Sequence, residues 1–252
     1  MHVVVVAPTF QERENVERFL EAVRAAVPRA HVLVVDDNSP DGTGLLADQA
    51  AQRLGQIQVL HRAGKTGLGS AYREGFAQAL GGAVGGVPDV VVSMDADFSH
   101  DPVVIPQLVA HVEAGAGLAI GSRYVPGGGT VNWPLHRRLL SRWGNRYTAW
   151  ILRLPIRDCT SGFRAYSAHA LRDIDPASTR AEGYAMLTEY ARRLCRRGHA
   201  VTEVPISFVD RQHGTSKMSG RIVIESMMRV TLWGLQDLFG RVVGFGSADR
   251  RR

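Results

Sequence analysis

The chain has 252 residues, enough for one large domain or two small ones. Hydrophobic residues make up 45% of it and charged residues 21%, which excludes a disordered chain and a fibrous one. Because there are only two cysteines, Cys159 and Cys195, a disulfide framework is also excluded and reduced thiols are expected. Thirty basic and 24 acidic residues give a net charge of +6, which favours an anionic partner such as nucleic acid, a phosphorylated metabolite or an acidic membrane surface.

Short apolar runs alternate with stretches of helical periodicity in the first half of the chain. The runs predict strands at His2–Val6, His31–Val35, Ile57–Leu60, Val87–Met94 and Leu118–Ile120. The periodic stretches predict helices at Asn15–Val27, Thr43–Leu54, Ser70–Leu80 and Pro102–Glu113. Strands that are apolar at every position are typical of a largely parallel α/β sheet covered on both faces. In such sheets ligands bind beyond the carboxyl ends of the strands, so we expect a site in the loops that follow them.

Two amphipathic helices are predicted in the second half. In Leu135–Leu152, one face carries Arg138, Arg142 and Arg146, and another carries Leu140, Trp143, Tyr147 and Ile151. The second segment, Ile222–Gly240, places Val223, Met227, Met228, Val230, Leu235 and Leu238 opposite Glu225, Arg229, Gln236 and Asp237. Basic helices with aromatic residues are typical of a membrane interface, although packing on the core or on another subunit is an equal alternative for the second. We expect one domain over residues 1–240 and a flexible basic tail over 241–252.

No membrane-spanning segment is predicted. Met1 leads directly into a strand-like run, which does not resemble a signal peptide, and no uncharged stretch reaches about 18 residues. Two nucleotide-binding signatures are also excluded. Gly64-Lys65-Thr66 resembles the end of a Walker A loop, but Val59 stands at the leading glycine position, and the first strand is not followed by a glycine-rich turn.

Asp95-Ala96-Asp97 follows the fourth predicted strand and is the strongest single feature. Two carboxylates one residue apart at the mouth of a buried strand can bind a hard divalent cation such as Mg²⁺ or Mn²⁺. The alternative is a solvated turn, and Asp101 before Pro102 is a candidate cap for the next helix. Because a similar acidic pair follows the second strand, the metal interpretation is favoured.

That second pair is Asp36-Asp37. Carboxylates in this position can hydrogen-bond a nucleobase or ribose hydroxyls, while Asn38-Ser39-Pro40-Asp41-Gly42 is rich in turn-forming residues. We expect both, with the turn holding the second aspartate in place.

Four arginines lie where phosphate groups are expected. They are Arg123, Arg137, Arg164 and Arg211. The planar guanidinium group suits bidentate contact with phosphate oxygens, and Lys217 adds a point charge. Each alone would be read as a solvated surface residue.

Eight segments then resemble one known family, in the order in which that family has them. They are PTFQERENV, VVDDNSPDGT, GLGSAY, MDADFSHDP, GSRYVPGGG, NWPLHRR, SGFRAY and DRQHGTSKMS. Together they resemble the dolichol and polyprenol phosphate mannose synthases, which are family 2 glycosyltransferases with the Rossmann-like GT-A fold. The resemblance extends from about Val3 to Met218, nearly the whole chain.

The resemblance implies a role for each matching residue. The nucleotide sugar would contact Pro8, Phe10, Glu12, Val35, Asp37, Met94, Asp95, Ala96, Asp97 and Lys217, the first five holding guanosine. Asp95, Asp97 and, less securely matched, Ser99 would bind Mg²⁺ or Mn²⁺. The acceptor phosphate would contact Arg123, Arg137 and Ser141, and the catalytic set would be Asp95, Asp97, Arg123 and Arg211. Family members commonly have Tyr at the position of Phe10, so a hydroxyl contact would be lost while stacking is kept.

The implied reaction is inverting transfer of mannose from GDP-mannose to a polyprenyl phosphate. The resemblance also implies a peripheral protein on the cytoplasmic face of the membrane, bound directly or through an integral membrane partner. Because a phosphate acceptor is largely dianionic at neutral pH, no essential general base is expected.

Three alternatives remain open. The donor could instead be UDP-glucose or another sugar nucleotide. A sugar hydroxyl as acceptor would need a catalytic carboxylate, for which Asp158, Glu182 and Glu189 are the candidates. A non-catalytic nucleic-acid-binding protein is disfavoured, since carboxylates at the strand ends repel a phosphate backbone.

Overall fold

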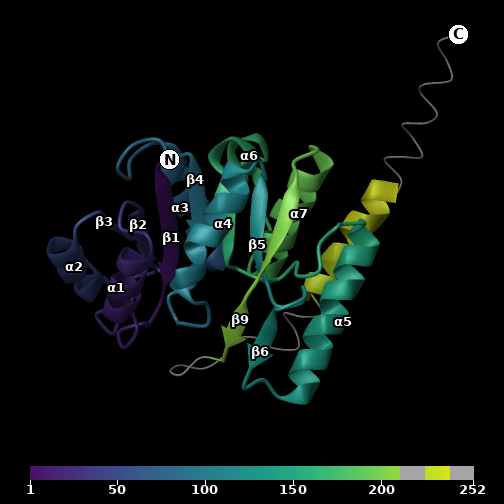
Figure 1. Cartoon of the computed structure of the whole chain (residues 1–252), viewed down its shortest axis with the longest axis horizontal. Helices are drawn as coiled ribbons and strands as arrows, with labels where there is room; N and C mark the ends of the chain where they lie inside the picture. The colour runs from purple at the N-terminus through teal and green to yellow at the C-terminus, as the bar shows by residue number, and fades with distance from the viewer. Residues whose placement is uncertain (211–224, 239–252) are drawn as a thin grey trace, which may run out of the picture.

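The computed structural model describes residues 1–210 and 225–238. The strands are β1 (Val3–Thr9), β2 (His31–Asp36), β3 (Ile57–His61), β4 (Val90–Ser93), β5 (Leu118–Ser122), β6 (Gly129–Val131), β7 (Arg164–Ser167), β8 (Val201–Pro205) and β9 (Ser207–Val209). The α-helices are α1 (Val16–Ala26), α2 (Thr43–Leu54), α3 (Leu68–Leu80), α4 (Ile105–Glu113), α5 (Leu135–Leu152), α6 (Ala168–Asp173) and α7 (Tyr184–Arg196). Two 3₁₀ turns, η1 (Pro102–Val104) and η2 (Pro176–Ser178), and a helical stretch at 225–238 complete the described chain (Figure 1).

Seven strands form the central sheet in the order β3-β2-β1-β4-β7-β5-β8. β7 runs antiparallel to β4 and β5, and the other neighbours are parallel. Successive residues of β1 point to opposite faces, so Val4 and Val6 pack in one hydrophobic cluster and Val5 and Ala7 in the other. Helices α3, α6 and α7 contribute to the first cluster, and α1, α2 and α4 to the second. The predicted mostly parallel sheet with helices on both faces is confirmed.

The strand order reverses beside β1, which positions the site. The chain passes from β1 to β2 and β3 on one side and then places β4 on the other side of β1. At such a reversal the loops at the carboxyl ends diverge and leave a crevice for ligands. Phe10 after β1 and Asp95 after β4 therefore lie on either side of this point.

The predicted helices Thr43–Leu54 and Leu135–Leu152 match α2 and α5 residue for residue. The predicted strand at Val87–Met94 starts too early, because β4 begins only at Val90: Val87 is exposed and Pro88 has no N–H for the sheet. The short sheet of β6 and β9, and strands β7 and β8, were not predicted. The predicted tail at 241–252 lies outside the described residues.

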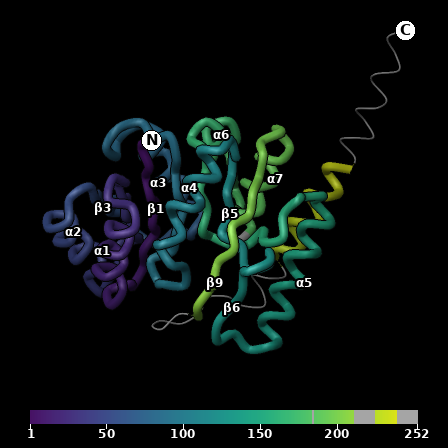
Figure 2. The backbone as a smooth tube through the Cα atoms, in the orientation of Figure 1, coloured from purple at the N-terminus to yellow at the C-terminus, as the bar shows by residue number. Residues whose placement is uncertain are grey.

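Helix α5 and residues 225–238 lie side by side beyond the β8 edge of the sheet (Figure 2). A Cβ at Gly234 would lie 2.4 Å from Ile151, so the missing side chain permits the close approach of the two helices. Tyr147 and Thr231 share a hydrogen bond of 2.6 Å, and Asp237 pairs with Arg192 of α7. Over residues 1–210 and 225–238, no helix has both the length and the apolar character needed to cross a bilayer.

Candidate active site

Four predicted site residues follow the carboxyl ends of parallel strands and so lie along one edge of the sheet. They are Phe10 after β1, Asp37 after β2, Asp95 after β4 and Arg123 after β5. Antiparallel β7 brings its preceding loop to the same edge, because Arg164 pairs with Ser93. A Cβ at Gly162 in that loop would lie 3.6 Å from Asp95 Oδ2. The edge therefore gathers residues from both halves of the chain.

The two aspartates after β2, Asp36 and Asp37, make different contacts. Asp36 organises the turn: its carboxylate accepts hydrogen bonds from Ser39 N at 3.0 Å, Ser39 Oγ at 2.6 Å and Thr9 Oγ1 at 3.1 Å. Asp37 instead forms an ion pair with Arg62, whose side chain is only 6% exposed. Burial raises the pKa of Asp37, against the hydrogen bond and charge of Arg62. The turn was expected to hold the second aspartate, but it is held mainly by an arginine after β3.

The remaining predicted nucleoside contacts cluster around these strands. Pro8 of β1 lies opposite Val35 of β2 in the parallel register. Val35 and Met94 are fully buried and Ala96 nearly so. Glu12 accepts a hydrogen bond from Asn15 Nδ2 at 2.8 Å. The structure thus brings Pro8, Phe10, Glu12, Val35 and Asp37 together at the ends of β1 and β2.

Asp95 and Asp97 line two neighbouring hollows. Asp95 lines a cavity of about 120 Å³ together with Arg123, Arg137 and Ser141. Asp97 lines a neighbouring hollow with Ser99, whose N and Oγ donate to Asp97 Oδ1 at 3.0 and 2.5 Å. The Ser99 hydroxyl therefore orients the Asp97 carboxylate in this structure. Further along, Asp101 Oδ1 accepts from Val103 N at 3.0 Å, which confirms the predicted cap.

The residues at this edge fit a hard divalent cation. Carboxylate oxygens are the donors that Mg²⁺ and Mn²⁺ favour, and Asp95 and Asp97 follow the end of β4 closely. In the described part of the chain, no group of three His, Cys, Asp or Glu side chains forms a complete ligand cage. An ion held by two carboxylates would complete its shell with water and substrate phosphate oxygens, as Mg²⁺ usually does.

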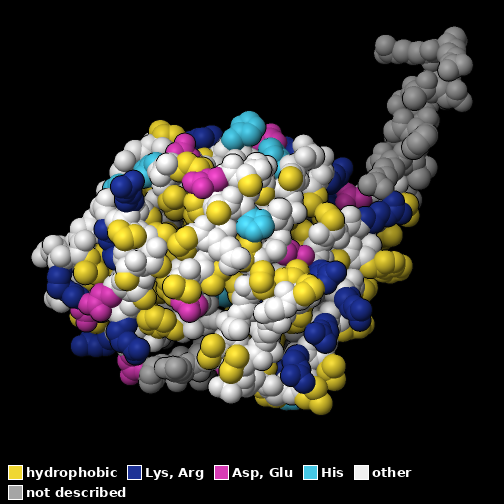
Figure 3. Space-filling view, in the orientation of Figure 1, with side chains coloured by type: hydrophobic (Ala, Val, Ile, Leu, Met, Phe, Trp, Pro, Cys, Tyr) yellow, Lys and Arg dark blue, Asp and Glu magenta, His cyan; other side chains and the backbone are white. Residues whose placement is uncertain are grey.

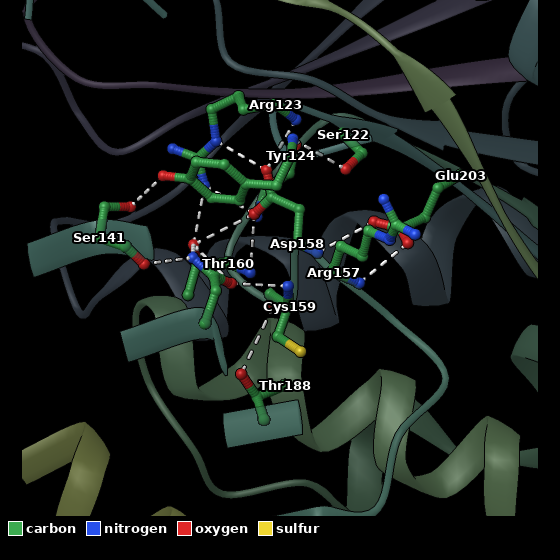
Figure 4. Close-up of polar contacts among 12 residues, drawn as sticks. Ser122, Arg123, Tyr124, Ser141, Arg157, Asp158, Cys159, Thr160, Thr188 and Glu203 are labelled. Atoms are coloured by element: carbon green, nitrogen blue, oxygen red, sulfur yellow. Dashed lines mark hydrogen bonds and ion pairs between the residues drawn. The ribbon is translucent and has the colours of Figure 1, made fainter. Parts of the chain in front are cut away.

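Arg123 is held by a buried, bidentate ion pair. Its Nε and Nη2 each donate to the Asp158 carboxylate at 2.7 Å, and Nη2 also donates to Thr160 Oγ1 at 2.8 Å. Figure 4 shows this network, in which Arg123 and Asp158 face each other beside Thr160. Burial disfavours the Asp158 carboxylate, yet the charge and hydrogen bonds of Arg123 keep its pKa below the ordinary value. Arg123 thus reaches the cavity in a fixed orientation.

The other predicted acceptor residues lie on or next to α5. Arg137 Nη1 donates to both oxygens of Asp210 at 3.0 Å, and its guanidinium lies 4.1 Å from the Trp133 ring centroid. Ser141 Oγ accepts from the Tyr124 hydroxyl at 2.6 Å. All of these except Tyr124 line the Asp95 cavity. Arg211 and Lys217 lie outside the described residues.

Arg164 is a structural residue. It is fully buried and donates to the backbone carbonyls of Ser161, Leu187 and Cys159 at 2.6 to 2.7 Å. The expectation that it lies at a phosphate is wrong. Instead it braces the loop that carries Asp158 and Gly162.

The carboxylates proposed as a catalytic base all have arginine partners. Asp158 pairs with Arg123, Glu182 with Arg73, and Glu189 with Arg193. Glu182 also accepts from Ser70 N at the first turn of α3. These ion pairs favour structural roles for the three groups.

Sequence reasoning missed several residues at this edge: Arg62, Tyr72, Trp133 and Thr160. The Tyr72 hydroxyl approaches Asp95 Oδ1 at 3.5 Å, and Trp133 stacks on Arg137. Trp133 and Tyr72 were visible as parts of the NWPLHRR and GLGSAY segments, but nothing in the sequence near Arg62 indicated its partners. Their positions depend on contacts across the fold.

Known structures share this fold. Glucosyl-3-phosphoglycerate synthase from Mycobacterium tuberculosis, solved with phosphoglyceric acid, matches with a TM-score of 0.65 at 19% identity, over 91% of this chain and 80% of that one. The complex of that enzyme with Mn²⁺ and UDP-glucose matches with a TM-score of 0.63 at 19% identity, over 92% and 77%. At this identity the likeness concerns the fold alone, and it confirms the expected GT-A architecture.

Sequence relatives are much closer. Polyprenol monophosphomannose synthase of Mycolicibacterium smegmatis is 44% identical over 96% of this chain and 90% of its own. Undecaprenyl-phosphate mannosyltransferase of Micrococcus luteus is 46% identical over 93% and 95%, and dolichol-phosphate mannosyltransferase of Pyrococcus furiosus 34% identical over 91% and 63%. The model of Glycosyl transferase family 2 matches residues 4–175. The chain therefore belongs to glycosyl transferase family 2.

Proposed function

We propose that this glycosyltransferase transfers mannose from GDP-mannose to a polyprenyl phosphate, inverting the anomeric carbon. The observation that carries the proposal is the cavity at Asp95. Its lining includes Arg123 and Arg137, which suit a phosphate, and also Leu140, Met227 and Val230, which suit a hydrocarbon chain. A lipid phosphate is the acceptor class that needs both. The names of the relatives at 44% and 46% identity support the same reading.

A divalent cation is part of the proposal. Asp95 and Asp97, with Ser99 as the predicted third contact, would hold Mg²⁺ or Mn²⁺, and Lys217 and Arg211 are expected from the resemblance to add positive charge. When bound, the ion neutralises negative charge that grows on the leaving diphosphate. Arg123 contributes to the same end, because its orientation is set by Asp158 before substrate arrives.

The acceptor needs positioning more than deprotonation. Its phosphate oxygen attacks C1 of the mannosyl group while the bond from C1 to the diphosphate oxygen breaks, so GDP leaves and no proton has to be removed. The ion pairs of Asp158, Glu182 and Glu189 support this scheme, since each candidate base is engaged elsewhere. Direct displacement converts an α-linked donor into a β-mannosyl phosphate.

One assay tests the proposed reaction. Labelled GDP-mannose, polyprenyl phosphate and Mg²⁺ or Mn²⁺ are incubated with the protein, and lipid-linked label is extracted and its anomeric configuration determined by NMR. We expect β-mannosyl product, with no product in EDTA. Efficient transfer from UDP-glucose but not GDP-mannose, or a retained α linkage, would contradict the proposal.

We also propose that α5 and residues 225–238 contact the membrane surface. Leu135, Leu139, Trp143 and Trp150 of α5 are 52 to 75% exposed, next to the exposed arginines 138, 142 and 146. Met228, Leu232, Leu235 and Leu238 are also exposed. Figure 3 shows blue basic and yellow apolar side chains interspersed over the region of α5. Such a surface suits an interface with anionic lipid. An integral membrane partner stays a prediction.

A further inference from the structure

Lys65 lies close to Phe10, one of the proposed nucleoside contacts, but has no role in the reaction proposed above. It belongs to the Gly64-Lys65-Thr66 fragment, which is not a Walker A loop, and lies between β3 and α3. Its Nζ lies 4.0 Å from the centroid of the Phe10 ring. Phe10 follows β1, so this ammonium group stands at the carboxyl edge of the sheet, where nucleotides bind in open α/β folds.

Arg62 holds the loop that carries Lys65. Arg62 Nη2 donates to Thr66 Oγ1 at 2.7 Å and to Ser70 Oγ at 2.6 Å, and Nη1 pairs with Asp37. Nε donates to Glu74 at 2.8 Å. One nearly buried guanidinium therefore ties the residues flanking Lys65 to the carboxylate after β2. The charge of Lys65 is near enough to Asp37 to lower its pKa, although burial dominates and raises it.

Phe10, Asp37 and Lys65 together offer a flat aromatic face, an acceptor and a cationic donor. A nucleobase is a flat ring that stacks on aromatic side chains and is read by hydrogen bonds at its edge. A carboxylate beside an ammonium group matches an edge where a ring N–H stands next to a carbonyl oxygen. Guanine and uracil have that lactam edge, whereas adenine and cytosine carry an amino group in place of the carbonyl.

We propose that Lys65 donates to the carbonyl oxygen of the donor's nucleobase while Asp37 accepts from the adjacent ring N–H, which makes Lys65 a specificity-determining residue. This inference rests on the proposed function for the presence of a nucleotide, and it extends that function to the choice of base. Without a base, the ammonium group lies on the Phe10 ring. When a base stacks there, Lys65 exchanges this cation–π contact for a charge-assisted hydrogen bond.

The test is calorimetric titration of GDP and ADP, each with Mg²⁺, into the full chain and three variants. Lys65→Ala removes the donor, Lys65→Arg keeps a cationic donor, and Arg29→Ala removes an equal charge just before β2, at the opposite edge of the sheet. We expect Lys65→Ala to weaken GDP binding about tenfold or more, because hydrogen bonds to charged groups are worth that much. ADP binding should change far less, so the ratio of the affinity for GDP to that for ADP should fall. Lys65→Arg should retain most of the preference, and Arg29→Ala all of it.

The alternative is that Lys65 merely attracts the diphosphate. In that case Lys65→Ala weakens GDP and ADP equally, and the inference is overturned. It is also overturned if Lys65→Ala binds GDP like the wild type. A titration of UDP under the same conditions separates this inference from the proposed donor. If the wild type binds UDP more tightly than GDP, and Lys65→Ala reduces its preference for UDP over ADP, the inference about the lactam edge holds and GDP-mannose as the donor is contradicted.

Discussion

The loop after β4 and the segment from β5 to α5 hold their functional side chains in different ways. After β4 the Asp97 carboxylate sits in a short turn closed by its neighbour Ser99. After β2 only the turn residue Asp36 is closed in this way, by Ser39, whereas Asp37 is held by Arg62, 25 residues away. After β5 the cations are held by distant residues, Arg123 by Asp158, which is 35 residues away, and Arg137 by Asp210, which is 73 residues away. The proposed metal-binding turn after β4 is therefore local in sequence, and the basic part of the site is not.

Substitutions in the two regions should therefore affect activity and stability differently. A local turn reforms around a substituted side chain, so a change there removes chemistry and leaves the fold intact. A buried long-range ion pair also holds the chain together, so breaking it removes stability as well. The first region should lose activity without stability, and the second should lose both.

The largest effect is expected at the acidic turn. Asp95→Asn with Asp97→Asn removes the carboxylates proposed for the cation, so transfer should fall about a thousandfold, the scale of losing transition-state charge stabilisation. Unfolding in denaturant should remain close to wild type. Asp101→Asn is the matched control, because Asp101 lies in the same loop but caps η1 and should retain nearly full transfer. Equal losses in both variants would place the chemistry elsewhere.

Next comes the buried pair. Asp158→Asn leaves the Arg123 charge buried with weaker partners, and the free energy of unfolding should drop by about 3 kcal/mol. Denaturant melts measure this directly. Glu21→Gln, which loses a solvent-exposed pair with Arg53, should leave the unfolding free energy almost unchanged. If the two variants unfold alike, Asp158 does not anchor Arg123.

A smaller effect separates the membrane surface from the catalytic edge. Trp143→Ser and Trp150→Ser each remove an exposed ring, so binding to anionic vesicles should weaken about tenfold for each, as measured by sedimentation. Transfer to a short, water-soluble prenyl phosphate should stay unchanged. Leu45→Ser is the control, since Leu45 is 68% exposed on α2 at the far end of the sheet. If Leu45→Ser weakens vesicle binding as much as the two tryptophan variants do, the membrane-binding surface is not the one formed by α5 and residues 225–238.

The smallest effect concerns the amino ends of β1 and β2, opposite the site. His2 Nε2 and His31 Nδ1 lie 3.0 Å apart, and burial together with the charges of His2 and Arg24 lowers the pKa of His31 below its ordinary value of 6.5. The unfolded chain then binds more protons than the folded one just below that value, so stability falls as the pH is lowered. Unfolding melts between about pH 7.5 and 5.5 should show this slope, and His31→Gln should reduce it. The affinity of the folded protein for nucleotide should not show the same pH dependence, because His2 and His31 lie at the opposite edge of the sheet from the site.

The linear sequence was sufficient for the parallel core and the acidic loops. Val3–Val6 and Val32–Val35 are apolar at every position, which is typical of a strand covered on both faces. The turn-forming residues beside Asp36 and the cap at Asp101 act within a few residues. Helix α5 was equally readable, since its periodicity is local.

Only the tertiary structure decided which charges reach the site. Arg123 and Arg164 look alike in the sequence, yet one lines the cavity and the other is fully buried against backbone carbonyls. Antiparallel β7 brings the loop that contains Gly162 beside Asp95, and the segment after β3 brings Arg62 beside Asp37 and Lys65 beside Phe10. Local patterns record how a segment meets water and its own neighbours. The partner of a buried charge depends on which distant strand becomes its neighbour, and that is determined only when the sheet assembles.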